Sequence, residues 1–383
     1  MLRKLLLAFS AVVLAFSSAT DLAAEDKKPL RLPFAYVFSG PAADYGTRTW
    51  NQVAIPGMKV INERGGIKGR KLEFYKVDTR HPETAPWVTD FRRLAADPDI
   101  PVIYPVGTTK STLAIFDLTG ELKMPAFSPA STGRWPLPSF GDWMFRMMPQ
   151  IDTSSPPLLK KAKAKFGLER VALVHTDDDD MAVGNYRALK KIVPAVGLDI
   201  AIEQTFKSED KNLAAQVAAI RAAEVDAVVV SLQPWSAGTL ALQLRERGVA
   251  APIIGDPGLI PPEYWELSKG KGNDTYMYAY WSPHDQRPVV QDWIKLWRET
   301  TGQHDKFPDS FITAYFDGLM VLAHVLETAE DLSRESVRQS FLAVDELETI
   351  SGFITWNKAG DVERPTSPVL VQWKDGVVVP WTD

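Results

Sequence analysis

The feature that most constrains the fold is an alternation of apolar, strand-like runs with amphipathic helical stretches, which occurs twice along the chain. The first series predicts strands at residues 30–38, 71–77, 101–106 and 125–128, and the second at 170–175, 199–206, 225–231, 252–255 and 275–281. Helices of about 10–15 residues between successive strands indicate βαβ crossovers and therefore parallel sheets. The sequence predicts an α/β protein of two similar lobes, each with a parallel central sheet.

The first 24 residues have the three-part pattern of a secretory signal peptide. Arg3 and Lys4 precede an apolar run at residues 5–16, and small residues continue to Ala24 before a polar stretch. The apolar run is shorter than the ~20 residues that a bilayer-spanning helix needs. We expect export with cleavage after Ala24, with Ala19 as the alternative position. An uncleaved N-terminal anchor is the less favoured interpretation.

The parallel pattern breaks at three places where a proline or a polar turn follows, near residues 148–151, 281–283 and 350–352. We expect the chain to cross between the lobes there. The N-terminal lobe would then comprise residues 25–149 and 283–350, and the C-terminal lobe residues 150–282 and 351–383. Ligands of parallel sheets bind beyond the carboxyl ends of the strands. Two such lobes facing each other predict a cleft that closes by a hinge motion.

The composition excludes several classes of function. Cysteine is absent, which rules out disulfides, thiol nucleophiles, iron–sulfur clusters and cysteine-based zinc sites. The net charge is −5 and the chain has no long basic run, which argues against nucleic acid as a partner. The motifs of serine hydrolases, zinc proteases, P-loop proteins and dinucleotide-binding proteins are missing. We expect no cofactor, no metal site and no catalysis; an exported hydrolase is the least favoured alternative, because scattered residues can converge in space.

Hydroxyl-rich loops follow two neighbouring strands of the first series. Residues 106–112 (VGTTKST) open a helix, and residues 128–132 (SPAST) follow the next strand. Donor groups at a helix N-terminus suit a carboxylate, although simple capping of the helix explains the same residues equally well. Because two such loops come together at one sheet edge, we expect Thr108, Thr109 and Thr132 to form an anion site.

Polar and aromatic residues also follow strands of the second series. Residues 177–180 are four consecutive aspartates, a run that is usually a solvated loop and lacks the alternation and the glycine of a calcium loop. If one of the four faces the cleft, we expect it to be Asp180. Trp235 directly follows a strand and is better placed to meet a ligand than the other tryptophans, most of which should pack in the core.

Several motifs resemble those of one protein family. Residues 38–46 (FSGPAADYG), 62–72 (NERGGIKGRKL) and 352–361 (GFITWNKAGD) are similar to segments of the type I periplasmic solute-binding proteins, above all the Leu/Ile/Val-binding proteins of ABC importers. Asp78 fits an acidic residue that follows the family's second strand, and residues 128–132 resemble its ligand loop. The resemblance implies two Rossmann-like lobes joined by a three-segment hinge. It also implies a periplasmic monomer that delivers a small solute to an ABC permease in the inner membrane; a periplasmic sensor subunit is the alternative.

The resemblance also implies which residues hold the ligand. Thr108, Thr109 and Thr132 would bind an α-carboxylate, and Tyr45 would contact the ligand's side chain. The loop containing Ala130 and Ser131, together with an acidic residue of the C-terminal lobe, would bind an α-ammonium.

The chain departs from the family pattern in the C-terminal lobe. Asp180 stands where the family usually has tyrosine, and either Gln233 or Trp235 occupies a second tyrosine position. Asp256, displaced by one position, stands near the family's ammonium-binding glutamate. We expect an amino acid or a related small carboxylate as the ligand. If Asp256 points away from the cleft, an aromatic or aliphatic acid is the better ligand, because an unpaired buried ammonium is costly.

Overall fold

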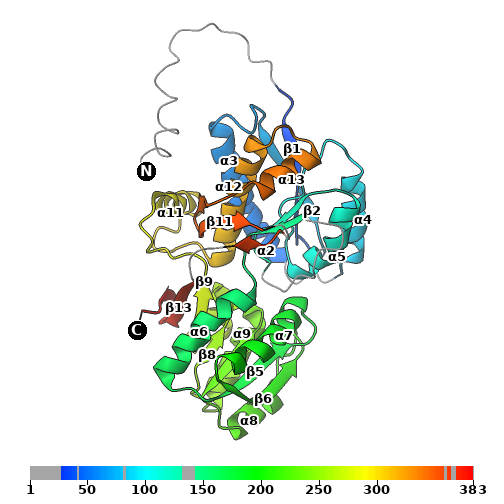
Figure 1. Cartoon of the computed structure of the whole chain (residues 1–383). Coiled ribbons are helices and arrows are strands. Elements are labelled where there is room, and N and C mark those ends of the chain that lie inside the picture. The colour runs from blue at the N-terminus through cyan, green and yellow to red at the C-terminus, as the bar shows by residue number, and fades with distance from the viewer. Residues whose placement is uncertain are drawn as a thin grey trace.

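The computed structural model describes residues 27–40, 43–80, 83–131, 143–357, 360–363 and 368–382. They form two α/β lobes, one above the other in Figure 1. The expected signal peptide and Thr132 lie outside these residues.

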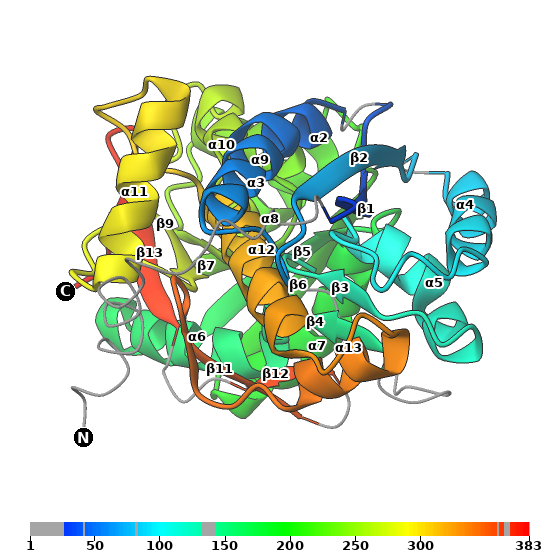
Figure 2. The same cartoon turned by 90° about the horizontal axis from the view of Figure 1, so that it is seen from above.

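The N-terminal lobe is built on a parallel sheet. Its strands are β1 (Leu30–Tyr36), β2 (Leu72–Asp78), β3 (Ala126–Ser128) and β4 (Met144–Arg146). Its helices are α2 (Ala43–Thr49), η1 (Trp50–Ala54), α3 (Ile55–Glu63), α4 (Ala85–Ala95), α5 (Thr109–Glu121), α11 (Pro288–Thr301), α12 (Ser310–Thr328) and α13 (Arg334–Leu342). β1 pairs with β2 and β3 with β4, and residues 101–106 join the two pairs through single parallel bridges. Figure 2 shows α4 and α5 on one side of these strands and α3 with α12 on the other.

The segment after β1 is one continuous helical stretch with an irregular turn. The sequence predicts a helix over residues 49–64 with a kink at Pro56; the structure begins the helix at Ala43 and places a π-helical turn, η1, just before that proline. Proline has no N–H to bond the preceding turn, which explains the irregularity. A Cβ atom at Gly46 would lie 1.8 Å from the carbonyl oxygen of Val37, so glycine lets α2 pack directly on the end of β1. Tyr45 is therefore held on a helix rather than on a loop.

Helix α12 is the core of this lobe. It is long and apolar enough to cross a membrane by length and composition alone, but 67% of its most apolar window is buried inside the protein. Burial against the sheet and the neighbouring helices accounts for its composition, because a helix that is apolar on most sides is buried.

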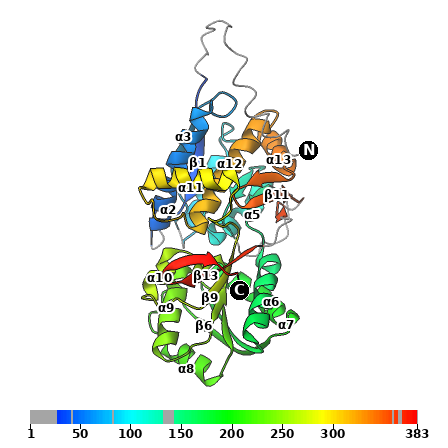
Figure 3. The same cartoon turned by 90° about the vertical axis from the view of Figure 1, so that its left-hand side faces the viewer.

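The C-terminal lobe is built on a seven-stranded sheet of order β14-β13-β9-β8-β7-β5-β6. Its strands are β5 (Arg170–Thr176), β6 (Asp199–Phe206), β7 (Ala227–Ser231), β8 (Ile253–Gly255), β9 (Thr275–Ala279), β13 (Val369–Lys374) and β14 (Val377–Pro380). Its helices are α6 (Ile151–Phe166), α7 (Asp180–Ala195), α8 (Ala214–Ala222), α9 (Pro234–Glu246), η2 (Pro257–Leu259) and α10 (Pro262–Leu267). Strands β5 to β9 are parallel, whereas β13 and β14 add antiparallel at one edge. In Figure 3, α6 and α7 lie on one side of this sheet and α9 and α10 on the other.

The mostly parallel sheets and flanking helices confirm the predicted fold class. Helix α6 was not predicted, because Pro156 and Pro157 in its first half obscure the helical pattern. The chain passes between the lobes after β4 and again between β9 and α11.

The third crossing lies later than the sequence suggests. Strands β10 (Leu347–Thr349), β11 (Gly352–Trp356) and β12 (Val362–Glu363) form a small sheet on the N-terminal lobe. There Trp356 is buried against Phe145, and its indole N–H donates to the carbonyl oxygen of Arg146 at 2.6 Å. The guanidinium of Arg146 pairs with Asp361. The chain therefore reaches the C-terminal lobe only before β13, not near residues 350–352, because these buried contacts keep the segment on the first lobe.

Asp78 ties down the loop that connects β1 to α2. Its carboxylate accepts hydrogen bonds from the backbone N–H groups of Phe38 at 2.9 Å and Arg80 at 3.0 Å. Partial burial acts to raise the pKa of Asp78, but hydrogen bonds from Ser39, Phe38 and Arg80 outweigh it and lower that pKa below its usual value. Because the loop leads into α2, Asp78 also helps to position Tyr45.

We predict that Asp78→Asn lowers the free energy of unfolding by roughly 1 kcal/mol at neutral pH, since the charged acceptor is lost. A carboxylate with a lowered folded-state pKa stabilises the fold above its unfolded-state pKa of about 3.9, and the contribution disappears as the pH falls through the folded-state pKa. The difference between variant and wild type should therefore shrink in acid. Urea denaturation of both proteins across the acidic range measures it; a difference that is independent of pH would contradict this role.

Candidate ligand-binding site

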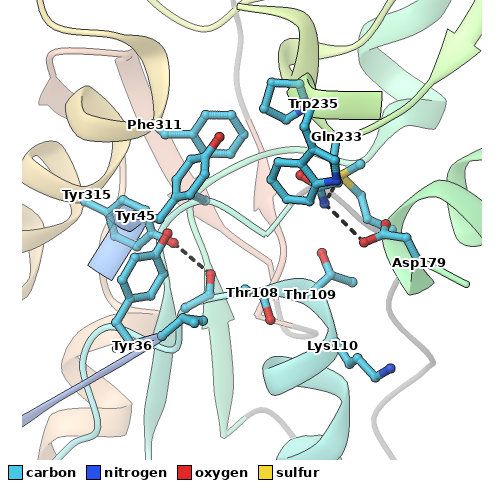
Figure 4. A pocket seen from close by; sticks show the side chains of 15 residues that line it. Tyr36, Tyr45, Thr108, Thr109, Lys110, Asp179, Gln233, Trp235, Phe311 and Tyr315 are labelled. Carbon is cyan, nitrogen blue, oxygen red and sulfur yellow. Dashed lines mark hydrogen bonds between the residues drawn. The ribbon is translucent and has the colours of Figure 1, made fainter. Parts of the chain in front are cut away.

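A cavity lies between the two lobes, with about 720 Å³ of empty space including its open mouth. Figure 4 shows its lining. The N-terminal lobe contributes Tyr36, Val37, Tyr45, Gly107, Thr108, Thr109, Lys110, Ala130, Phe311 and Tyr315, and the C-terminal lobe contributes Asp179, Met181, Gln233, Pro234 and Trp235. The cavity therefore exists only when both lobes are present.

The N-terminus of α5 forms one wall. Thr108 caps this helix in an extended conformation, and its hydroxyl accepts from the N–H of Ser111 at 3.1 Å. Gly107 allows a close approach, since a Cβ atom there would lie 2.0 Å from the ring of Tyr36. The first N–H groups of a helix have no carbonyl partner within the helix, and together with the dipole of this 13-residue helix they favour an anion at this position. Lys110, also on the lining, adds a positive charge.

The second hydroxyl-rich loop packs beside the first. The hydroxyls of Thr109 and Ser131 are 3.1 Å apart and both residues are buried. Ala130 lines the cavity, whereas Ser131 lies behind Thr109 and fixes it. The structure thus brings together Thr108, Thr109, Ala130 and Ser131, while Thr132 falls outside the described residues.

Aromatic rings form a second part of the lining, which adjoins the α5 wall where the Tyr315 hydroxyl donates to the carbonyl oxygen of Gly107 at 2.7 Å. Tyr45 and Trp235, from different lobes, meet edge to face with ring centroids 6.1 Å apart. Tyr36 and Tyr315 meet in the same way at 5.0 Å, and Phe311 lies one helical turn from Tyr315 on α12.

Two polar atoms in this aromatic wall could form a hydrogen bond with a solute. The Tyr45 hydroxyl and the Trp235 indole N–H are buried and make no hydrogen bond to any residue that the structure describes. Burial raises the pKa of Tyr45 well above its usual value, so its phenol stays protonated. The wall therefore offers flat apolar surfaces together with polar groups that have no protein partner among the described residues.

The sequence pattern predicts Tyr45 and Trp235 at the site but does not single out three further rings of this wall. Tyr36 is indistinguishable from a core residue of β1, and Phe311 and Tyr315 come from a helix almost 200 positions beyond the other first-lobe residues. Their i, i+4 spacing on α12 was the available signal, because such residues share one helix face.

The acidic residue at the cavity is Asp179, not the expected Asp180. Asp179 caps α7: its carboxylate accepts from the N–H of Ala182 at 2.9 Å and from the side-chain amide of Gln233 at 3.2 Å. Asp180 is the exposed first residue of α7 and is not part of the lining. The sequence pattern predicts that this helix begins at residue 184, four residues later than it does. The capping role of Asp179 could therefore not be recognised, although the side chain of a capping residue turns towards the helix end, which here faces the cleft.

The neighbouring aspartates are engaged at the surface. Asp177 pairs with the ammonium of Lys207 at 2.6 Å, and Asp178 accepts from the N–H of Ser208 at 2.9 Å. The solvated-loop interpretation thus fits both, and Asp179 alone of the four lines the cavity.

Asp256 lies inside the C-terminal lobe rather than on the cavity lining. It is 2% exposed and accepts from the hydroxyl of Ser231 at 2.6 Å, the amide of Asn185 at 3.2 Å and the N–H of Gly258 at 2.9 Å. Burial raises the pKa of its carboxyl group. As the capping residue of η2, Asp256 turns its side chain back towards the sheet, so its oxygens meet protein donors instead of a ligand.

We predict that Asp256→Asn lowers the free energy of unfolding by about 1–3 kcal/mol. The amide NH₂ group that replaces one carboxylate oxygen cannot accept a hydrogen bond, so it would face a protein donor and leave that donor without a partner. The affinity for solute should change less than twofold. Chemical denaturation and calorimetric titration of the same preparation separate the two effects. A large loss of affinity at unchanged stability would place Asp256 in the ligand site after all.

Comparison with known proteins identifies the family. A family model described as periplasmic binding protein matches residues 29–376. The chain belongs to this family. Membership confirms the resemblance found in the sequence motifs and makes the protein a member of a family of solute-binding proteins.

Relatives cover almost the whole chain. A Leu/Ile/Val-binding protein homolog of Brucella melitensis is 22% identical over 95% of this chain and 97% of its own. An amino acid binding protein of Pseudomonas aeruginosa is 24% identical, with 95% of each chain covered. Among solved structures, the substrate-binding protein of a branched-chain amino acid transporter from Streptococcus pneumoniae, in complex with isoleucine, superposes with a TM-score of 0.79 at 19% identity, covering 92% of this chain and 99% of that one. This last similarity supports the two-lobed fold.

Proposed function

We propose that this solute-binding protein serves an ABC importer from the periplasm, capturing an amino acid or a related small carboxylate between its lobes and presenting it to the permease. The observation that carries the proposal is charge complementarity across the cavity. The N-terminus of α5 faces it from one lobe and the carboxylate of Asp179 from the other, as Figure 4 shows. A zwitterion would place its carboxylate at the N-terminus of α5 and its ammonium near Asp179.

The energetics favour this orientation. Hydrogen bonds to charged groups contribute about 1.5–3 kcal/mol each, roughly twice the neutral kind. Thr108 and Thr109 offer hydroxyls and helix N–H groups to the carboxylate. Asp179 has accepting capacity left beyond its two protein hydrogen bonds, because a carboxylate provides about four lone-pair sites. The names of the relatives from Brucella melitensis and Streptococcus pneumoniae support an amino acid.

An aromatic monocarboxylate is the second candidate. Two observations favour it: Asp256 is turned away from the cavity, and aromatic rings from both lobes form much of the lining. An aromatic acid would use the α5 anion site and stack among these rings without needing a partner for an ammonium. The two candidates differ in their dependence on Asp179.

We predict that Asp179→Asn weakens binding of leucine or phenylalanine at least tenfold, since the ammonium loses its charged partner. Asp180→Asn is the matched control, because it removes the same charge from the adjacent, exposed position. Calorimetric titration of wild type and both variants with leucine, phenylalanine and benzoate measures the affinities.

The pattern of results decides between the candidates. Binding of an amino acid that depends on Asp179 but not on Asp180 supports the zwitterion. Binding of benzoate alone, unaffected by Asp179→Asn, supports the aromatic acid. No binding of any of the three would exclude both solute classes.

A further inference from the structure

An ion pair joins the two lobes just outside the ligand cavity. A guanidinium nitrogen of Arg48, on α2 of the N-terminal lobe, lies 3.2 Å from a carboxylate oxygen of Glu263, on α10 of the C-terminal lobe. Figure 3 shows these two helices facing each other where the lobes meet. Neither residue belongs to the cavity lining.

Arg48 is held in place from its own lobe. The same guanidinium nitrogen lies 3.6 Å from Asp309, whose other oxygen accepts from the N–H groups of Phe311 and Ile312 at the start of α12. The guanidinium also sits over the ring of Tyr45, with its carbon 5.0 Å from the ring centroid. Arg48 therefore keeps its orientation and one anionic partner without any contribution from the C-terminal lobe.

Glu263, by contrast, depends on the contact between lobes. Its side chain is 33% exposed, and one carboxylate oxygen is buried without a hydrogen-bond partner among the described residues. Burial acts to raise the pKa of Glu263, and the charge of Arg48 opposes that effect. Separation of the lobes would expose this carboxylate to water. Closure removes part of that hydration and replaces it with the ion pair to the guanidinium of Arg48.

We propose that Arg48 and Glu263 form a closure latch, an ion pair that stabilises the closed arrangement of the lobes and slows solute release without touching the solute. This inference rests on the proposed capture of solute between the lobes. A protein that binds only in its closed conformer has an apparent affinity proportional to the closed fraction. The latch residues thus act as positioning residues for binding. Tyr45 separates the latch from the cavity, since its ring contacts Arg48 on one side and Trp235 on the other.

The two members of the latch should not be equivalent. Removing the charge of Glu263 deletes one attraction and leaves Arg48 paired with Asp309. Removing the charge of Arg48 leaves two carboxylates close together in a partly buried site with no cation, and such an uncompensated site is more costly than the loss of the pair itself. Arg48→Gln should therefore open the lobes more than Glu263→Gln does.

The absence of cysteine makes closure directly measurable. Lys59→Cys in α3 and Glu246→Cys in α9 place a cysteine at an exposed position of each lobe. Spin labels attach only to these two cysteines, because the chain has no other, and they report the distance between the lobes. In the solute-free protein we expect Glu263→Gln to reduce the ratio of closed to open conformers about two- to fivefold. Glu266→Gln, which removes an exposed charge on the same helix α10, is the matched control; Glu266 has no ion-pair partner among the described residues, so this variant should change the ratio less than Glu263→Gln does.

Further variants separate a latch from a structural role. Arg48→Lys should retain most of the closed fraction because the charge remains, and the double variant Arg48→Gln/Glu263→Gln should be less open than Arg48→Gln alone. If the titrations detect phenylalanine binding, its dissociation rate should rise by the same factor as the ratio of closed to open conformers falls. Identical distance distributions in wild type and Glu263→Gln, whether both open or both closed, would overturn the latch. Shifted distances in a protein that binds none of leucine, phenylalanine or benzoate would leave the latch standing and remove the proposed solute class.

Discussion

Parallel strand pairing is the constraint on which the rest of this structure depends. Because every strand of a parallel sheet runs the same way, the loops that follow the strands gather at one edge. In the N-terminal lobe that edge carries the turn before α5 and the loop after β3; in the C-terminal lobe it carries the turns before α7 and α9. The cavity lies where these two edges face each other, and polar groups from distant parts of the chain meet there.

Desolvation decides which acidic residues of the C-terminal lobe are available to a solute. Asp179 and Asp256 both cap a helix after a strand of the same sheet. Asp256 is enclosed and satisfied by three protein donors, so it contributes to the fold. Asp179 keeps accepting capacity at the cavity surface. Glu263 lies between these extremes, since its environment changes with the contact between lobes, and that property makes it suited to control closure.

The sequence predicted the architecture well because the apolar periodicity of the strands and helices is strong. Nearly every expected strand appears, and the two hydroxyl-rich loops meet as adjacent strand ends must. The errors have local causes. Two prolines inside α6 interrupt its helical pattern, so this helix was not predicted. The start of α7 was predicted too late, and Asp180 was therefore expected at the cleft in place of Asp179. The strand around Trp356 was expected on the wrong lobe, because periodicity shows that a strand is buried but not which core buries it.

The sequence by itself determined the fold class and the family, and it predicted that two hydroxyl-rich loops meet at one edge of the first lobe's sheet, because these features depend on local pattern and on strand order. Tertiary structure alone decided which side chains share the cavity: the rings of Phe311 and Tyr315 arrive from α12, and Asp256 is turned into the lobe's interior. It also decided that Arg48 meets Glu263 across the lobes. Contacts between residues more than 200 positions apart depend on how two lobes pack, and neither helical nor strand periodicity carries that information.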